Sequence, residues 1–192
     1  FVVGLYGFFF VSLRDPRRYT YGLFALGGLS GIFYPAWSLG LTQPVFGTFD
    51  TAIVAVMLTV AAVAAIHFSH AYFGLQRPHR AWLGLVAVAF VAAIFARNPF
   101  RSMHVLGPLL FVATISNAAV QLVLCVRLRR QNPRPRNLYL IALAWPATAL
   151  LAVPDFLAWL GYGDPLGGWR TACVGIALIS IMQATALSRE HL

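Results

Sequence analysis

The sequence predicts an all-α membrane protein, a bundle of seven transmembrane helices with its N-terminus outside the cell and its C-terminus in the cytoplasm. Hydrophobic residues make up 60% and charged residues 10% of its 192 residues, and the mean hydropathy is +0.77. A water-soluble core of this size cannot hide so many apolar side chains. The basic residues are all arginines, and eleven of the fourteen lie in alternate gaps between seven apolar stretches. Because basic loops stay in the cytoplasm, this distribution predicts the orientation.

The first two helices are expected in residues 1–13 and 19–40. The first stretch is shorter than a helix that crosses about 30 Å of hydrocarbon at 1.5 Å per residue, so we expect it to be truncated at its N-terminal end. Arginines follow this stretch instead of preceding it, which disfavours a signal peptide. Residues 41–50 contain Pro44 and no basic residue, which predicts a turn outside the cell.

The next three helices are expected in residues 51–73, 81–96 and 103–126. Charged segments containing proline, residues 76–80 and 97–99, separate them. Proline disfavours helical backbone in the residue before it, so these segments predict helix ends.

The last two helices are expected in residues 138–160 and 169–187. Residues 127–136 carry five arginines and two prolines, which predicts a hydrated loop before the sixth helix. The glycine-rich residues 161–168 form the turn before the seventh helix. Prolines inside the fifth and sixth helices remove backbone donors and should kink or loosen them; these are Pro108, Pro146 and Pro154.

The net charge of +9 does not indicate nucleic-acid binding, because the arginines occupy short loops and form no basic face on a soluble fold. Membrane lipids, through the headgroups of the inner leaflet, are the expected partners. Only Arg97, Arg101 and Arg170 lie on the outer side. We interpret residues 1–192 as one membrane domain, in which Cys125 and Cys173 lie too far apart along the bundle for a disulfide.

Both ends of the chain resemble the bacterial seven-transmembrane receptors with diverse intracellular signalling modules. Residues 5–19, which include Ser12-Leu13-Arg14-Asp15, are similar to the family's signature between helices one and two. Residues 157–163 resemble its turn before helix seven, and residues 175–190 resemble its closing stretch. The seven-helix input regions of some other histidine kinases share the helix count and a charged turn after helix one.

The resemblance implies a sensory input domain in the bacterial inner membrane. Its seventh helix would lead into a cytoplasmic histidine kinase, such as that of a two-component system, or a diguanylate cyclase, expected after residue 192. An extracellular ligand-binding domain would precede Phe1. The stimulus would be an unidentified small molecule or a periplasmic domain, and two-protomer signalling would suit a homodimer.

Asp155 is the acidic residue most deeply placed in the predicted membrane region, in the outer part of helix six. An ionised carboxylate at a helix centre costs about 2.5–3.5 kcal/mol on insertion scales, so it needs a partner or water. Arg97, Arg101, His104 and Arg170 are expected toward the same face. We interpret the group first as a structural pair near the interface and second as a ligand-binding pocket.

Asn117 and Gln121 lie four residues apart and therefore on one face of helix five. Hydrogen bonding between helices explains them, with Gln183 of helix seven as a partner. They are also possible ligand-binding residues.

His67 and His70 have the spacing of two metal ligands on one helix face. No cysteine or carboxylate lies at a helical interval nearby, so we predict no metal site and no cofactor, with interfacial hydrogen bonding as the simpler explanation.

The sequence contains no recognisable catalytic set, so we predict that this chain is not an enzyme. The first hypothesis is a receptor that couples an outer or intramembrane stimulus to helix seven. The alternative is a small-molecule transporter or lipid-handling protein that uses Asp155, Asn117 and Gln121 as a polar path. A passive membrane anchor for a fused enzyme is the third possibility.

Overall fold

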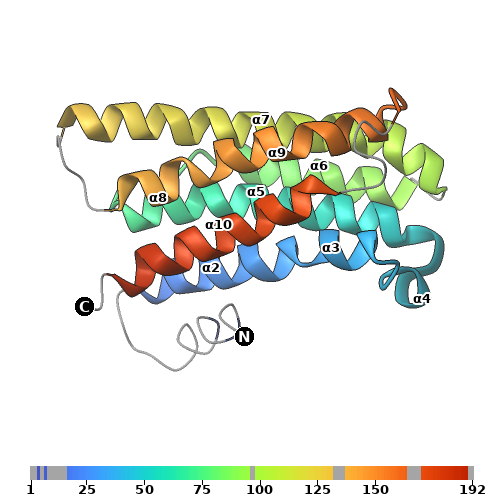
Figure 1. Ribbon diagram of the computed structural model, residues 1–192, viewed down its shortest axis with the longest axis horizontal. Coiled ribbons are helices and arrows are strands. Elements are labelled where there is room, and N and C mark those ends of the chain that lie inside the picture. Colours follow the sequence, from blue (N-terminus) through green and yellow to red (C-terminus); the bar gives the residue numbers. More distant parts are fainter. Residues whose placement is uncertain are drawn as a thin grey trace.

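The computed structural model describes Gly4, Gly7 and residues 17–95, 98–131, 137–163 and 170–189, and these residues form helices and short connections without a strand (Figure 1). The expected first helix, residues 1–13, lies outside the described residues apart from the two glycines. The elements are α2 (Arg18–Gly31), α3 (Phe33–Ser38), α4 (Gln43–Phe46), the 3-10 helix η1 (Gly47–Phe49), α5 (Asp50–Tyr72), α6 (Ala81–Phe95), α7 (Pro99–Gln131), α8 (Leu138–Ala142), α9 (Ala144–Trp159) and α10 (Thr171–Ser188).

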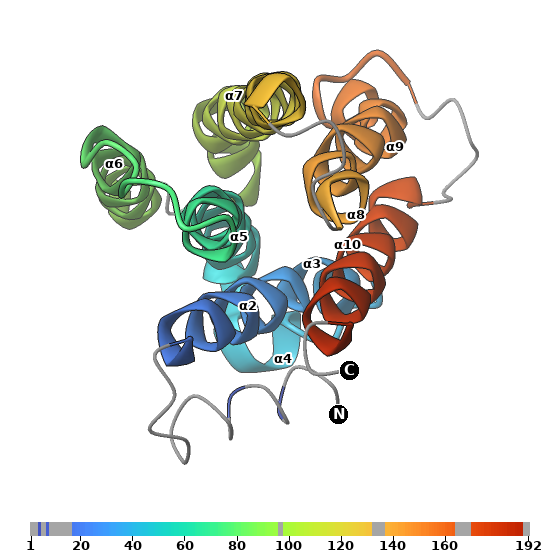
Figure 2. The ribbon, with the colours of Figure 1, turned by 90° about the vertical axis from the view of Figure 1, so that its left-hand side faces the viewer.

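The long helices run nearly parallel to one axis (Figure 1), and α5 has the largest buried share among the four long apolar segments. Viewed along that axis, α2, α5, α7, α8 with α9, and α10 surround a common centre, and α6 lies outside this ring beside α5 (Figure 2). The largest contacts join α10 to α9, α2 to α5, and α5 to α7, whereas α10 meets α2 over only a small area. The ring is therefore closed least tightly between its first and last described helices.

Four segments of the described chain are long and apolar enough to cross a membrane. These are Gln43–Tyr72, His104–Gln131, Leu138–Ala158 and Thr171–Ser188. Helix α6 is also apolar but has only 15 residues, and large side chains on it, including Phe90 and Phe95, are exposed. Exposed apolar surface of this kind suits contact with lipid. The chain is thus an all-helical membrane protein.

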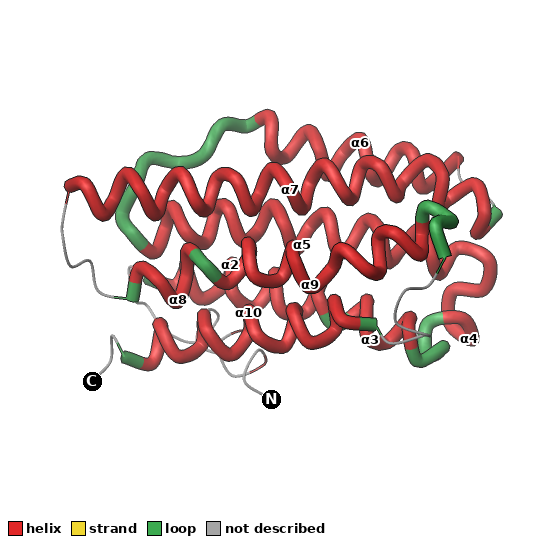
Figure 3. The backbone as a smooth tube through the Cα atoms, turned by 45° about the horizontal axis from the view of Figure 1, so that its top comes forward, coloured by secondary structure: helices red, strands yellow, loops and turns green. Residues whose placement is uncertain are grey.

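Two of the expected helices are each interrupted at one residue, and a proline explains both interruptions. Ile32 separates α2 from α3, and Leu143 separates α8 from α9, where Figure 3 shows a short break in the helix. Pro35 and Pro146 follow three residues later, so the carbonyls four residues before each proline lose their helical donor. Backbone bonds continue on both sides of the breaks, with Ile32 N to Gly28 O at 3.1 Å. An effect of Pro146 on its helix was expected, whereas the interruption before Pro35 was not predicted.

Two local predictions were wrong. Residues 127–131, expected in a hydrated loop, continue α7 to Gln131 because arginine is a good helix former and the helix-breaking prolines come later in the chain. The expected turn at residues 41–50 contains the short helices α4 and η1. Pro108 and Pro154 lie inside α7 and α9, which continue past them, and the kinks expected there stay predictions.

The antiparallel helices bring the arginine-rich segments to one end of the bundle, which we call the basic end. Phe24 of α2, Phe68 of α5, Ile141 of α8 and Leu187 of α10 pack together near this end. The described arginines there are Arg17, Arg18, Arg77, Arg80, Arg127, Arg129, Arg130 and Arg189. The other end, which carries α4, has Arg101 and Arg170 among the described residues.

Candidate functional site

Asp155 lies on α9 near the end of the bundle that carries α4, and its side chain is 5% exposed. Its oxygen Oδ2 accepts a hydrogen bond of 2.7 Å from the Tyr34 hydroxyl of α3. The same oxygen accepts a bond of 2.9 Å from the backbone N–H of Ala172, in the first turn of α10. One carboxyl group therefore joins three helices.

The bond to Ala172 satisfies a donor that the helix itself cannot satisfy, because the first four N–H groups of a helix have no partner within it. A carboxyl oxygen at this position also faces the positive end of the helix dipole. Asp155 thus acts as an N-terminal cap of α10 supplied by another helix, which we call the Asp155 cap. Its second oxygen, Oδ1, is buried without a hydrogen-bond partner among the described residues.

Of the expected partners of Asp155 that the structure describes, which are Arg101, His104 and Arg170, none forms an ion pair with it among the described residues. Arg101 and His104 are exposed on the first turns of α7. Arg170 precedes α10 and is half-buried near Tyr34, with which it interacts electrostatically. Arg97 lies outside the described residues.

Asn117 and Gln121 are both fully buried on α7. The Gln121 amide Nε2 donates to the Asn117 oxygen and to the carbonyl of Ala65 on α5, both at 3.3 Å. Gln121 therefore bonds to another helix, as expected, but through the Ala65 carbonyl, and the expected partner Gln183 does not take part in this bond among the described residues. The structure does not bring Asn117 and Gln121 to Asp155, and neither of these two amides lines the cavity described below.

The histidines of α5 are not arranged as a metal site in the described region. His70 Nδ1 lies 2.9 Å from the carbonyl of Ile66 on its own helix, and His67 Nε2 is buried without a hydrogen-bond partner among the residues that the structure describes. The described residues contain no group of three or more histidine, cysteine, aspartate or glutamate side chains placed to hold a metal. Cys125 and Cys173 are free thiols.

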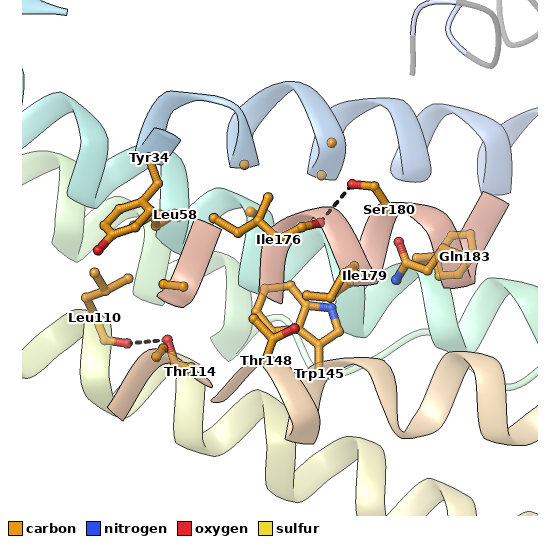
Figure 4. Close-up of a pocket in the computed structure, with 18 of the residues that line it drawn as sticks. Tyr34, Leu58, Leu110, Thr114, Trp145, Thr148, Ile176, Ile179, Ser180 and Gln183 are labelled. Carbon is orange, nitrogen blue, oxygen red and sulfur yellow. Dashed lines mark hydrogen bonds between the residues drawn. The ribbon is translucent and has the colours of Figure 1, made fainter. Parts of the chain in front are cut away.

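A cavity that is partly open runs between the helices of the ring (Figure 4). Its volume is about 80 Å³, measured for the centres of water-sized spheres. Asp155 and Tyr34 line one end, and Gln183 of α10 and Phe68 of α5 line the other. Small residues such as Gly27 and Ala61, with apolar side chains between them, form most of the wall. The cavity exists because these positions lack bulky side chains.

Helices α9 and α10 touch most closely at Thr148 and Gly175. The Thr148 hydroxyl lies 2.9 Å from the carbonyls of both Ala144 and Gly175, so it shares its hydrogen between its own helix and its neighbour. A Cβ atom added to Gly175 would lie 2.7 Å from Thr148 Cγ2 and 3.1 Å from Thr148 Cα. Glycine is therefore required for this approach. Closer to Asp155, the Thr171 hydroxyl donates to the carbonyl of Leu151.

The basic end of α10 is held by a second group of side chains. The Tyr72 hydroxyl of α5 donates to the Ala186 carbonyl at 3.3 Å. Asn137, which precedes α8 with a left-handed φ of 58°, donates to the same carbonyl at 3.2 Å and to the Tyr72 oxygen at 2.9 Å. Ala186 lies in the last turn, where carbonyls lack helical partners. We call this group the Tyr72–Asn137 cap.

Helix α10 is thus held at both ends and in the middle by side chains of other helices. Of these contacts, the sequence indicated only Asp155. Tyr34 and Tyr72 lie among other aromatic residues in apolar helices and carry no local signal, whereas a glycine within the seventh helix could have indicated the close contact at Gly175. Such an arrangement can transmit a change at either cap along the helix.

A family model described as 7TM diverse intracellular signalling matches residues 1–190. The comparisons with curated proteins and with solved structures give no match. The matched residues include all the helices described above.

Proposed function

The chain belongs to the 7TM diverse intracellular signalling family, and on that basis we propose that it is the membrane-embedded input domain of a bacterial signal-transduction protein. The family match confirms the resemblance noted at both ends of the sequence. In this proposal, α10 is the seventh transmembrane helix and carries the signal to a cytoplasmic effector such as a histidine kinase or a diguanylate cyclase. The chain itself performs no catalysis.

The contacts of α10 carry the proposal. A helix that relays a signal must have two arrangements of similar free energy. The stimulus must bind one of these arrangements more tightly than the other. The two caps bond opposite ends of α10 through one side chain at Ala172 and two at Ala186, and these hydrogen bonds can break while the apolar core stays packed. Together they provide the kind of local contact whose loss favours a second arrangement.

The distribution of arginines supports the orientation in this proposal. The basic end carries eight described arginines. Loops rich in arginine favour the cytoplasmic side of an inner membrane. The C-terminal end of α10 lies at the basic end, so the effector would follow on the cytoplasmic side. The N-terminus would then lie outside, and the match over the whole chain supports a total of seven helices.

The transporter alternative is less well supported by the geometry. A transport path needs polar groups that connect both faces of the membrane. Asn117 and Gln121 lie outside the cavity that Asp155 lines. The hydroxyls of Thr114, Thr148 and Ser180 in its wall already donate to carbonyls of their own helices.

We predict that breaking the Tyr72–Asn137 cap alters signalling more than it alters stability. With a reporter enzyme fused after α10, Tyr72→Phe and Asn137→Gly should change the unstimulated output at least about twofold, because each removes bonds to Ala186 worth about 0.5–1.5 kcal/mol. Glycine is chosen for Asn137 because it tolerates the left-handed backbone. The measurement is reporter activity at equal membrane levels of each protein.

Tyr139→Phe is the matched control, since Tyr139 on α8 is 49% exposed and lies close to the same end. Its output should equal that of the unchanged protein. Equal outputs for all three variants would contradict a relay through this cap and favour a passive anchor.

A further inference from the structure

The cavity contains polar atoms that the protein leaves unused. The Trp145 indole Nε1 and the Gln183 amide Nε2 are buried without a hydrogen-bond partner among the described residues. Trp145 is 9% and Gln183 is 6% exposed, and both line the cavity. Figure 4 shows the indole and the amide on either side of Ile179, facing the same part of the cavity. Buried donors in proteins nearly always have a partner, so a bound acceptor is indicated here.

The rest of the wall restricts what can occupy the cavity. The hydroxyls of Thr114, Thr148 and Ser180 are used within their own helices, so the middle of the cavity is effectively apolar. A buried water needs about two to four polar partners, which this middle region does not offer. A chain of ordered water is therefore a poor occupant, and an apolar one is favoured.

The dimensions point to a single narrow chain. Ala172, at the Asp155 end, and Gln183 are eleven residues apart on α10, which corresponds to about 16 Å along the helix. One water-sized group needs about 10–15 Å³ on this measure of volume, so 80 Å³ holds roughly five to eight such groups. Arranged over this length, they form one file of atoms, which suits a linear chain better than a ring system or a branched ligand.

We propose that the cavity binds one acyl chain, whose carbonyl oxygen accepts hydrogen bonds from Trp145 Nε1 and Gln183 Nε2 and whose methylene groups extend toward Asp155. Gln183 lies five residues before the end of α10, about 8 Å from the basic end. The carbonyl would therefore face the headgroup side of one leaflet, and the chain would point into the membrane. The source is either a free fatty acid or an acyl chain of a phospholipid.

If the chain is a sensory domain, as proposed above, binding of an acyl chain would affect the position of α10. The cavity wall includes α10 residues from Ala172 to Gln183, which lie between the two caps. An acyl chain in the cavity would support the present position of α10, and its absence would favour another position. This consequence rests on the proposed sensory role, whereas the binding itself does not.

Photolabelling tests the binding directly. The protein is reconstituted in phosphatidylcholine vesicles and exposed to dodecanoic acid, or to a phospholipid, that carries a diazirine on the acyl chain. We expect labelling of cavity residues, such as Gly27, Ala61 and Ser180, in addition to the lipid-facing surface of α6. The probe that labels the cavity, the fatty acid or the phospholipid, identifies the source of the bound acyl chain.

Two serines of α10 provide a matched pair of variants. Ser180 lines the cavity, and Ser188 is exposed beyond it; both donate to the carbonyl four residues earlier. Ser180→Leu should abolish cavity labelling, whereas Ser188→Leu should leave it unchanged. Gln183→Leu should weaken it by about twofold to tenfold, the range for the loss of one hydrogen bond. Labelling of α6 serves as the internal reference in every variant.

Labelling confined to α6 and other lipid-facing positions, with both probes, would overturn the inference. So would cavity labelling that survives Ser180→Leu. The reporter fused after α10, measured on the same variants, separates the two proposals: lost labelling with unchanged output supports the acyl-chain site and contradicts its sensory role.

Discussion

Replacing Asp155 with alanine is expected to lower the free energy of unfolding by about 2–5 kcal/mol. The substitution removes the carboxyl oxygen that accepts bonds from the Tyr34 hydroxyl and the Ala172 N–H, and losing a buried acceptor costs about 1–3 kcal/mol for each bond. It also removes the group that faces the N-terminal end of the α10 dipole. Reversible unfolding in mixed micelles can be followed by a dye that reacts with the free thiols of Cys125 and Cys173.

Two further variants make this prediction specific. Asp155→Asn keeps a carbonyl oxygen that can accept both bonds. Its free energy of unfolding should therefore fall clearly less than that of Asp155→Ala. Asp50→Ala removes an aspartate that, among the described residues, bonds to the neighbouring Thr51 at the start of α5, and a carboxylate in the first turn of a helix is worth about 0.3–1 kcal/mol. Equal decreases in the free energy of unfolding for Asp155→Ala and Asp50→Ala would contradict the role of Asp155 as a link between helices.

Gly175→Ala is expected to destabilise the protein by about 1–3 kcal/mol, although alanine is the better helix former by about 1 kcal/mol. The added Cβ would lie 2.7 Å from Thr148 Cγ2 and 3.1 Å from the Thr148 backbone, so α9 and α10 must separate. Separation also weakens the bond from the Thr148 hydroxyl to the Gly175 carbonyl. The same unfolding assay measures the effect.

Gly84→Ala is the control with the opposite expected sign. Nothing lies within 4 Å of a Cβ added to Gly84, which is exposed on α6, so stability should be unchanged or should rise. Combining Gly175→Ala with Thr148→Ala removes the closest contact and should recover part of the loss. A Gly175→Ala protein as stable as Gly84→Ala would show that α9 and α10 do not pack as closely as described.

The helical fold could be predicted because long apolar stretches and arginine-rich gaps are properties of the sequence alone. The boundaries of α5 and α6 lie within one residue of the expected ones for this reason. The C-terminal extension of α7 was missed because exposed arginines are compatible with both a loop and a helix that continues into water. Leu143 marks a break that Pro146 predicted, and Ile32 marks one that Pro35 could have predicted.

The candidate site could be predicted only in part. A buried carboxyl group in an apolar helix needs a partner, which correctly indicated Asp155, but the charged residues nearby were the expected partners. The observed partner, Tyr34, lies 121 residues away in the chain. Only the packing of α3 against α9 and α10 brings it to Asp155. The Tyr72–Asn137 cap likewise joins residues 65 positions apart, and no local pattern distinguishes them.

The relay through α10 is tested most directly by rotating the effector relative to the bundle. One to four alanines are inserted after Ser188, before a fused reporter enzyme, and each insertion rotates the helix by about 100°. Our account predicts that reporter output varies with the helical period, changing with one or two insertions and returning toward the original value with four. Output that is the same for every insertion would contradict the relay and leave the chain as a membrane anchor.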